Sequence, residues 1–144
     1  MRLNLVLYYL LMKQTSHIQK IQFWPPIEEE LGFSQIVKVG NTIYLSGMVG
    51  HKDGGFPGDP HIQYEAVYRN IQEILATQGA TLADIAVERV YFTAELLKLD
   101  PVVRRRIRGD VYGNSFPAST WVQVQALVEP NAMVEIEVMA VLPE

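Results

Sequence analysis

The clearest pattern in this sequence is an alternation of two sets of residues over the last part of the chain. Small or branched residues occupy every second position of residues 120–127, and the same holds for residues 133–142. A period of two is typical of β-strands, whose successive side chains point to opposite faces of a sheet. The link between the runs is short and contains Pro130 and Asn131. It therefore predicts a turn and an antiparallel pair of strands.

The two faces of this predicted pair differ in polarity. One face is small and apolar, which suits burial beneath helices. The opposite face mixes apolar side chains with two glutamines and two glutamates: Trp121, Leu127, Met133, Met139 and Val141 with Gln123, Gln125, Glu135 and Glu137. Such a surface is too apolar for water and too polar for a dry core, so it predicts contact with another subunit or with a ligand.

Strand patterns also occur earlier in the chain. Residues 33–39 and 42–46 predict a hairpin, because Gly40 and Asn41 between them tolerate the backbone conformation of a tight turn. Residues 86–93 return to a period of two. The sequence therefore predicts a first hairpin, a middle strand and a final pair of strands.

Two helices are predicted between these strands. Residues 62–78 carry an apolar stripe and are followed by Gly79, the residue type preferred just after a helix end. Asp100 and Pro101 form a start signal for a second helix. The stripes consist of Val67, Ile71, Ile74 and Leu75 in the first helix, and of Val103, Ile107 and Val111 in the second. The order ββαβαββ predicts an α+β domain with both helices on one face of the sheet.

The size and composition of the chain limit the possible classes of protein. With 144 residues it is long enough for one domain with a full core, and we assign residues 1–30 to an N-terminal extension and lead-in and residues 31–144 to a single domain. It has no cysteine, which is compatible with a reducing, cytoplasmic environment. Its net charge of −4 argues against a general nucleic-acid-binding protein. Small molecules or copies of the chain are the expected partners.

The first residues need a separate interpretation. Residues 3–11 are apolar and follow Arg2, as in a signal peptide. They are too short to span a bilayer, which takes about 20 residues, so we expect no membrane span. Three interpretations remain open: an extension upstream of a true start at Met12, a secretion signal, or an extra packed element. Residues 14–30 are polar and contain two adjacent prolines, and they predict an extended lead-in.

Self-association follows from the polarity of the predicted sheet. Two helices can cover only one of its faces. The mixed face of the last two strands is then left without a cover inside one chain. A homo-oligomer that closes several sheets around a shared axis is the simplest way to bury it.

A glycine-rich loop suggests a metal or phosphate site only weakly. His51, Asp53 and His61 flank this loop. Metal sites need three or four ligands in a defined geometry, and two histidines ten positions apart fall short of this. The loop also lacks the lysine–serine pair of a phosphate-binding loop. We therefore expect no metal and no cofactor.

Several motifs, taken in order, carry a resemblance to a known family. They read Gly32-Phe33-Ser34-Gln35 continuing to Tyr44-Leu45-Ser46-Gly47, then Phe116-Pro117-Ala118, then Val134-Glu135-Ile136-Glu137 continuing to Leu142-Pro143. Over residues 31–143 the chain resembles the RidA family, also called the YjgF family. This resemblance implies a chorismate-mutase-like homotrimer whose sheets form a barrel, with ligand clefts between the subunits. Well-studied members hydrolyse enamines and imines, such as 2-iminobutanoate, to the 2-keto acid and ammonia, so the implied ligand belongs to the imino or keto acid class.

The resemblance also implies roles for individual residues. Glu135 corresponds to the glutamate that positions the attacking water, while Phe33, Ser46 and Gly47 line the cleft. The position of the arginine that binds the substrate carboxylate is held by Ser119. A neutral hydroxyl cannot form the two parallel charge-assisted hydrogen bonds of a guanidinium.

Three further side chains bear on the predicted site. Trp121 stands where many family members carry a small residue, and we expect it to fill part of the cleft. Arg104 on the second helix is a candidate replacement for the missing cation, although a solvated surface arginine is the simpler interpretation. Glu137 is expected to pair with a basic group across a subunit contact. Glu135 has a simpler interpretation too, as a polar residue on a strand face.

Two functions therefore remain open. The first is a RidA-type protein that binds a small metabolite between subunits, or regulates a partner, without catalysis. The second is an imine or enamine deaminase that uses water positioned by Glu135, with Arg104 or a neighbouring arginine as the carboxylate anchor. The replacement of the family arginine by Ser119 favours the first.

Overall fold

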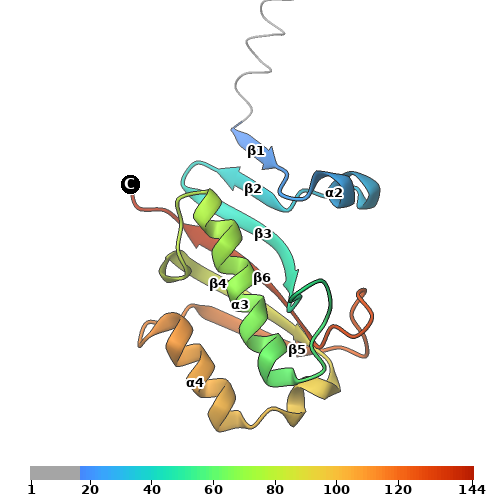
Figure 1. The fold of residues 1–144 in the computed structure, drawn as a ribbon. Coiled ribbons are helices and arrows are strands. Elements are labelled where there is room, and N and C mark those ends of the chain that lie inside the picture. The colour runs from blue at the N-terminus through green and yellow to red at the C-terminus, as the bar shows by residue number, and fades with distance from the viewer. Residues whose placement is uncertain (1–16) are drawn as a thin grey trace, which may run out of the picture.

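Six strands form one sheet, in the order β1-β2-β3-β6-β4-β5 (Figure 1). The computed structural model describes residues 17–144, so the interpretations of the apolar N-terminus and the choice between Met1 and Met12 lie outside the described residues. The strands are Ile18–Ile21 (β1), Ile36–Val39 (β2), Thr42–Val49 (β3), Ile85–Phe92 (β4), Ala118–Gln123 (β5) and Val134–Val141 (β6). Neighbouring strands are antiparallel except β4 and β5, which are parallel.

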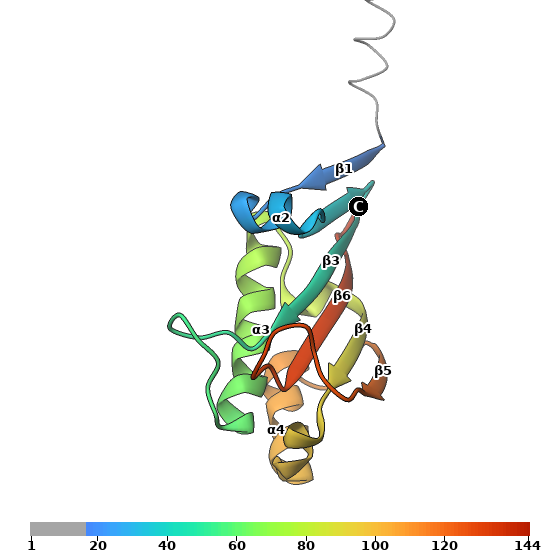
Figure 2. The same cartoon turned by 90° about the vertical axis from the view of Figure 1, so that its right-hand side faces the viewer.

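Two helices cover one face of this sheet, as the sequence predicted. The helical segments are α2 (Pro25–Leu31), α3 (Pro60–Thr77) and α4 (Pro101–Tyr112), with short 3-10 turns η1 (Leu82–Asp84) and η2 (Ala94–Lys98). Figure 2 shows α3 and α4 on the same side of the sheet. Both begin with an aspartate cap: Asp59 accepts a hydrogen bond from the His61 N–H at 2.8 Å, and Asp100 accepts one from the Val102 N–H at 2.7 Å.

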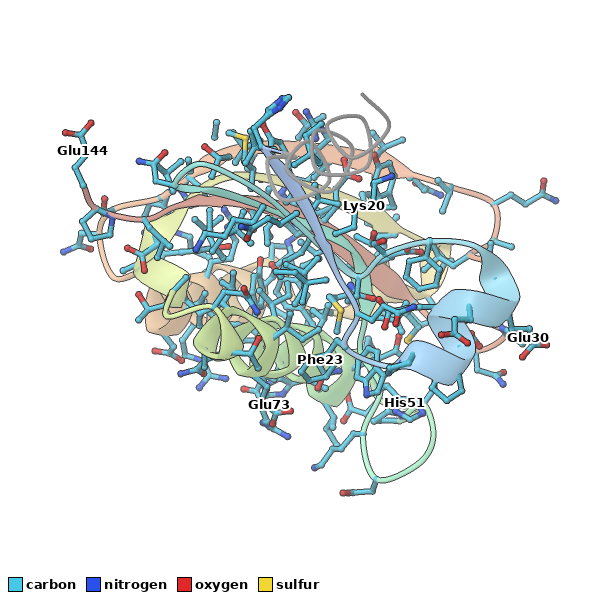
Figure 3. All side chains as sticks on the ribbon, turned by 90° about the horizontal axis from the view of Figure 1, so that it is seen from above. Lys20, Phe23, Glu30, His51, Glu73 and Glu144 are labelled. Carbon is cyan, nitrogen blue, oxygen red and sulfur yellow. The ribbon has the colours of Figure 1, made fainter. Side chains whose placement is uncertain are left out.

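The core lies between these two helices and the sheet. The predicted stripe of α3 is buried throughout, and so is the predicted apolar face of β6. Of the predicted stripe of α4 only Ile107 is buried, while Val103 and Val111 pack at the edge of the core. The buried residues on these elements include Val67, Ile71, Ile74 and Leu75 of α3, Val90 and Phe92 of β4, and Val134, Ile136, Val138 and Ala140 of β6. The predicted α+β class is confirmed. Seen from above, the sheet lies as one layer over α3 (Figure 3).

The first predicted hairpin is confirmed. Strands β2 and β3 pair so that Val39 lies opposite Thr42. Gly40 between them has a φ of +58°, the left-handed conformation that favours glycine. Strand β3 runs further than predicted, to Val49.

The predicted antiparallel pairing of the last two strands is wrong. Strand β5 pairs in parallel with β4, with Val90 opposite Trp121, and β6 lies between β3 and β4. The reason is the segment from β4 through α4 to β5, which forms a crossover that returns the chain parallel to β4 and places α4 on the covered face. Residues 124–133 then carry the chain past β4 to β6.

The predicted faces of β5 are also reversed. Trp121 packs against Tyr64 of α3 on the helix-covered face, whereas Val122 is 43% exposed on the other side. The prediction that Trp121 shares a face with Glu135 is therefore wrong, because Glu135 lies on the opposite face. Alternation shows which residues share a face, but a register shift of one residue exchanges the buried and exposed faces. On β6 the predicted faces are confirmed.

The prediction of an extended lead-in is wrong for residues 25–31, which form α2. Its two prolines are compatible with a helix because they occupy the first turn, where the N–H groups have no helical partner. The buried carboxylate of Glu28 accepts hydrogen bonds from the N–H groups of Phe23 (2.7 Å), Trp24 (2.5 Å) and Gln35 (2.5 Å). These hydrogen bonds hold α2 against the residue that precedes β2. Strand β1 pairs with β2 and forms the edge of the sheet.

Candidate functional site

Ser119 and Trp121, two of the predicted site residues, lie on β5 beneath helix α4. The Ser119 hydroxyl donates a hydrogen bond to Glu88 Oε1 at 2.7 Å, and the Trp121 indole N–H donates one to Ser119 Oγ at 2.9 Å. The parallel pairing of β4 and β5 places Glu88 directly beside Ser119. The residue at the family's arginine position is therefore bonded to a carboxylate.

Glu88 is fully buried, with 0% of its surface exposed. Besides Ser119, its carboxylate accepts hydrogen bonds from the hydroxyls of Tyr112 at 2.7 Å and Tyr68 at 3.1 Å, and it forms an ion pair with Arg108. A buried charge is tolerated when it is both paired and hydrogen-bonded in this way. We call these five residues the Glu88 network.

The protonation states of the Glu88 network follow from its surroundings. Burial raises the pKa of Tyr68 and of Tyr112 well above the ordinary range, and the charge of Glu88 adds to this. Burial acts to lower the pKa of Arg108, but Tyr68 and Glu88 beside it outweigh this and raise it. The tyrosines therefore remain hydroxyl donors and Arg108 remains a cation.

Trp121 packs between the core and the arginines of α4. The guanidinium carbon of Arg104 lies 5.3 Å from the centroid of its ring, and that of Arg108 lies 5.7 Å away. On the core side, the rings of Tyr64 and Phe92 have centroids 6.1 Å and 5.7 Å from that of Trp121. The structure thus brings the predicted site residues Arg104, Ser119 and Trp121 together.

Glu135 lies on the other face of the sheet, which we call the open face. Its neighbours Val134 and Ile136 are buried beneath the helices, so the side chain of Glu135 projects the opposite way. Burial raises the pKa of Glu135, and the nearby charges of Glu137 and Glu129 raise it further. Within residues 17–144 no group donates a hydrogen bond to its carboxylate.

Gly47 lies directly beside Glu135. The register between β3 and β6 shifts between Leu45 and Met48, so Ser46 and Gly47 sit in a β-bulge. A Cβ atom added to Gly47 would come within 2.0 Å of Glu135 Oε1. Only glycine at this position leaves room for the Glu135 carboxylate as it stands.

Two predicted site residues remain, Ser46 and Phe33. The Ser46 hydroxyl donates a hydrogen bond to the Ser34 carbonyl at 2.8 Å. Phe33 is 37% exposed. The predicted residues therefore form two groups, one on each face of the sheet: Glu135 with Gly47, and Arg104 with Ser119 and Trp121.

Glu137 pairs within its own chain. Arg89 Nη1 lies 2.9 Å from Glu137 Oε1, and the Tyr91 hydroxyl lies 3.4 Å from the same oxygen. This pair forms because β4 runs beside β6 and places Arg89 opposite Glu137. A partner for Glu137 across a subunit contact stays a prediction.

Sequence reasoning missed the Glu88 network, although a signal was present. Glu88 is separated by two and four positions from Val90 and Phe92, so the period of two in residues 86–93 places it on the same strand face as these two buried residues. A carboxylate on a buried face needs a cation or several donors. Arg108, one helical turn after Arg104, is the cation that meets this need.

Among the cavities within residues 17–144, two are each lined by three separate segments of the chain, and both lie apart from Ser119 and Glu135. One, of about 530 Å³, lies between the loops that contain Pro57 and Asn131. The Gln63 amide joins its walls by donating to the carbonyls of these two residues at 3.0 and 3.1 Å. The other, of about 300 Å³, is lined in part by Phe23, His51 and Glu73 (Figure 3).

Two absences hold for residues 17–144. No three histidine, aspartate or glutamate side chains there gather in a way that could hold a metal ion. None of the helices in this part of the chain is long and apolar enough to cross a membrane.

The fold defines a class: an α+β protein with a six-stranded sheet and its long helices on one face. The chain matches the family described as Endoribonuclease L-PSP over residues 26–142. It therefore belongs to that family, the YjgF/RidA family, which confirms the resemblance carried by its motifs. Members of this family form oligomers that bind small molecules.

Three relatives illustrate the similarity. The chain is 27% identical to a 2-iminobutanoate/2-iminopropanoate deaminase from Dermatophagoides farinae, over 76% of this chain and 85% of the relative. It is 34% identical to RidA from the Antarctic bacterium Psychrobacter sp. PAMC 21119, with a TM-score of 0.63 over 76% of this chain and 88% of that one. It is 27% identical to a YjgF/YER057c/UK114 family member from Mycobacterium tuberculosis, with a TM-score of 0.72 over 87% and 99% of the two chains.

Proposed function

We propose that this chain is a RidA-type protein that binds a small metabolite in a cleft between subunits and does not hydrolyse 2-imino acids. The observation that carries the proposal is the 2.7 Å hydrogen bond from Ser119 to the Glu88 carboxylate. The family resemblance assigns this position to the arginine that binds the substrate carboxylate. In this chain the same position faces a negative charge.

Ser119 is poorly suited to bind a carboxylate. Its only proton is directed at Glu88, and its oxygen already accepts the indole N–H of Trp121. A guanidinium would offer two parallel charge-assisted bonds instead. Loss of one partner from such a desolvated pair costs about 2–5 kcal/mol. Binding of a 2-imino acid is therefore expected to weaken by roughly thirtyfold or more.

Arg108 comes close to Ser119 but does not replace the lost arginine. Its Nη1 bonds to the same Glu88 oxygen as the Ser119 hydroxyl, and only 13% of its side chain is exposed. A ligand carboxylate would have to compete with a buried carboxylate that is already in contact. The charge of Arg108 is thus neutralised by Glu88 inside the fold and is not available to a ligand.

The proposed cleft requires a second copy of the chain. Ser119 and Glu135 face away from one another in one subunit, because they lie on opposite faces of the sheet. The open face also exposes apolar surface, including Val122 (43% exposed) and Tyr44 (46% exposed). A closed homotrimer would bury this face and bring Glu135 of one copy near β5 of the next. A ligand of the imino or keto acid class, the class implied by the family, is our first candidate.

An active deaminase is the second candidate, and the surroundings of Glu135 favour it. Its raised pKa and its lack of hydrogen-bond donors within residues 17–144 suit a carboxylate that binds water. In this mechanism Glu135 orients a water molecule that adds to the carbon of the C=N bond, and ammonia then leaves to give the 2-keto acid. Arg104 would hold the carboxylate of the substrate.

Keto-acid release from freshly generated 2-iminobutanoate separates the two candidates. We expect the purified chain to give no rate above the buffer blank. A rate that disappears in Glu135→Gln but persists in Glu137→Gln would contradict our proposal and establish the deaminase. A rate gained by Ser119→Arg would support a cleft that has lost only its anchor. Light scattering that shows a monomer would contradict the shared cleft.

A further inference from the structure

Helix α4, strand β5 and the segment that joins them bring together arginines and aromatic rings that stack on one another. The guanidinium carbon of Arg104 lies 5.3 Å from the ring centroid of Trp121, and that of Arg105 lies 4.6 Å from that of Phe116. Arg108 lies near both rings, at 5.7 and 5.8 Å. Stacking orients a guanidinium while leaving its N–H edge available. We call these five residues the arginine–aromatic patch.

Two of the three arginines in this patch carry uncompensated charge. Arg108 is paired with the buried Glu88. Arg104 and Arg105 form no ion pair with any carboxylate of residues 17–144. The chain as a whole has a net charge of −4, so a local excess of positive charge opposes the overall sign. Such a local field attracts anions to one part of the surface.

Gly109 gives Arg105 its place against the helix. A Cβ atom at Gly109 would lie 3.3 Å from Arg105 Nη1, closer than a relaxed contact. Glycine inside a helix lowers its stability by roughly 0.5–1 kcal/mol relative to alanine. Here it lets the Arg105 side chain lie along α4, one turn beyond its own backbone, where it reaches Phe116.

We propose that Arg104 and Arg105 anchor a ligand with two negative charges, either a phosphate monoester or a dicarboxylate. A dianion neutralises both guanidinium groups, whereas a 2-imino acid has one carboxylate and leaves one of them unpaired. Phe116, which is 41% exposed, offers an apolar contact for the rest of the ligand. This inference rests on the proposed function, because it names the ligand class of the cleft beside Ser119. It also moves the anchor from strand β5 to helix α4.

Tryptophan fluorescence offers a direct measurement. The chain contains two tryptophans, so Trp24→Phe leaves Trp121 as the reporter. The probes are methyl phosphate, succinate and acetate, titrated into the full chain at about pH 8, where a phosphate monoester with a second pKa near 6 is a dianion. Ionic strength is held constant with sodium chloride. We expect methyl phosphate or succinate to change Trp121 emission at concentrations at least about tenfold below acetate.

Matched single substitutions locate the site. Arg105→Gln removes an arginine that stacks on Phe116 and does not contact the reporter ring. Arg106→Gln removes the same charge from the next position of α4, outside the patch. We expect Arg105→Gln to weaken dianion binding by about tenfold and Arg106→Gln by about twofold or less. Calorimetric titration of Arg104→Gln, expected to match Arg105→Gln, avoids the change that this variant makes at Trp121.

The outcomes are distinct. Preference for methyl phosphate identifies a phosphate monoester, preference for succinate identifies a dicarboxylate, and both support the dianion site. Equal losses in Arg105→Gln and Arg106→Gln, acetate binding as tight as the dianions, or no signal at millimolar probe would overturn it. The result of the imino-acid assay is independent of all these outcomes. Absent dianion binding with absent turnover therefore overturns only this inference, while turnover of 2-iminobutanoate overturns the proposed function.

Discussion

Glu88 and Glu135 lie on neighbouring strands of one sheet and occupy opposite environments. Glu88 faces the helices, is fully buried, and accepts from Ser119, Tyr68, Tyr112 and Arg108. Glu135 faces the open side and, within residues 17–144, accepts no hydrogen bond. Burial raises the pKa of Glu135, and the charges of Glu137 and Glu129 raise it further.

This difference shows that the hydrogen-bond partners of a carboxylate, more than its burial, determine whether it can bind water or a ligand. The more deeply buried group has every acceptor position occupied by protein donors, so it stabilises the fold and offers nothing to a ligand. The half-buried group keeps its acceptor positions available for water or a ligand. Substitutions of Glu88, Gly47 and Glu135, each with a control, test this contrast.

The largest effect is expected for Glu88→Gln. The substitution leaves Arg108 as an unpaired cation with only 13% of its side chain exposed. Loss of one partner from a buried ion pair destabilises a protein by about 3–5 kcal/mol. Urea unfolding followed by circular dichroism measures this loss.

Glu137→Gln is the matched control on the open face. It breaks the pair with Arg89, in which the side chains are 34% and 55% exposed. Exposed pairs contribute about 1 kcal/mol or less. Adding Arg108→Met to Glu88→Gln should recover part of the stability, since it removes the unpaired charge. Equal losses in Glu88→Gln and Glu137→Gln would contradict the contrast.

The second largest loss of stability is expected for Gly47→Ala. The added Cβ would come within 2.0 Å of Glu135 Oε1, so the carboxylate must leave its place beside the bulge. Overpacking of this kind costs about 1–3 kcal/mol. Thermal unfolding measures the loss. Gly55→Ala is the control, because a Cβ there meets no atom within 4 Å. An unchanged Tm in Gly47→Ala would mean that β3 does not restrict the position of the Glu135 side chain.

A smaller effect, dependent on pH, is expected for Glu135→Gln. The raised pKa means that the folded chain keeps the Glu135 proton to a higher pH than the unfolded chain. Stability therefore falls as the pH rises from the unfolded value, about 4.3, through the higher folded value. Below the unfolded value both states are protonated and the penalty is absent. Glu135→Gln should thus stabilise the protein at pH 7, by less than about 1 kcal/mol, and give no gain at about pH 3.

Denaturant unfolding at the two pH values measures this difference. Glu137→Gln should give no gain at neutral pH, because it also removes the ion pair with Arg89. A gain from Glu135→Gln that is the same at both pH values would show that titration of Glu135 is not its cause.

The parts of the fold that were predicted correctly depend on neighbours in the sequence. The stripe of α3 and the alternation of β6 are local periodic patterns, and each was buried as predicted. The helix start at Asp100-Pro101 is a signal contained in two residues, and it was also correct. Local patterns of this kind determine element type, order and fold class.

The parts that were missed depend on residues far apart in the chain. The partner of β5 and the buried face of Trp121 were set by the crossover through α4. Glu88 lies 20 residues from Arg108 and 31 from Ser119. The family motifs drew attention to Ser119 and Glu135, and the functional roles of both residues stay predictions. The motifs carried no information that the two side chains lie on opposite faces.

The smallest effect is expected for Gly109→Ala, above the helix-covered face. Alanine favours a helix over glycine by up to about 1 kcal/mol. Its Cβ would lie 3.3 Å from Arg105 Nη1, the end of a flexible side chain that can move. We expect a slight gain in Tm together with weaker dianion binding. Gly113→Ala is the contrast, because its φ of +62° strains any side chain, and it should lower Tm. A gain in Tm with unchanged binding would show that Arg105 anchors its ligand without needing the space at Gly109.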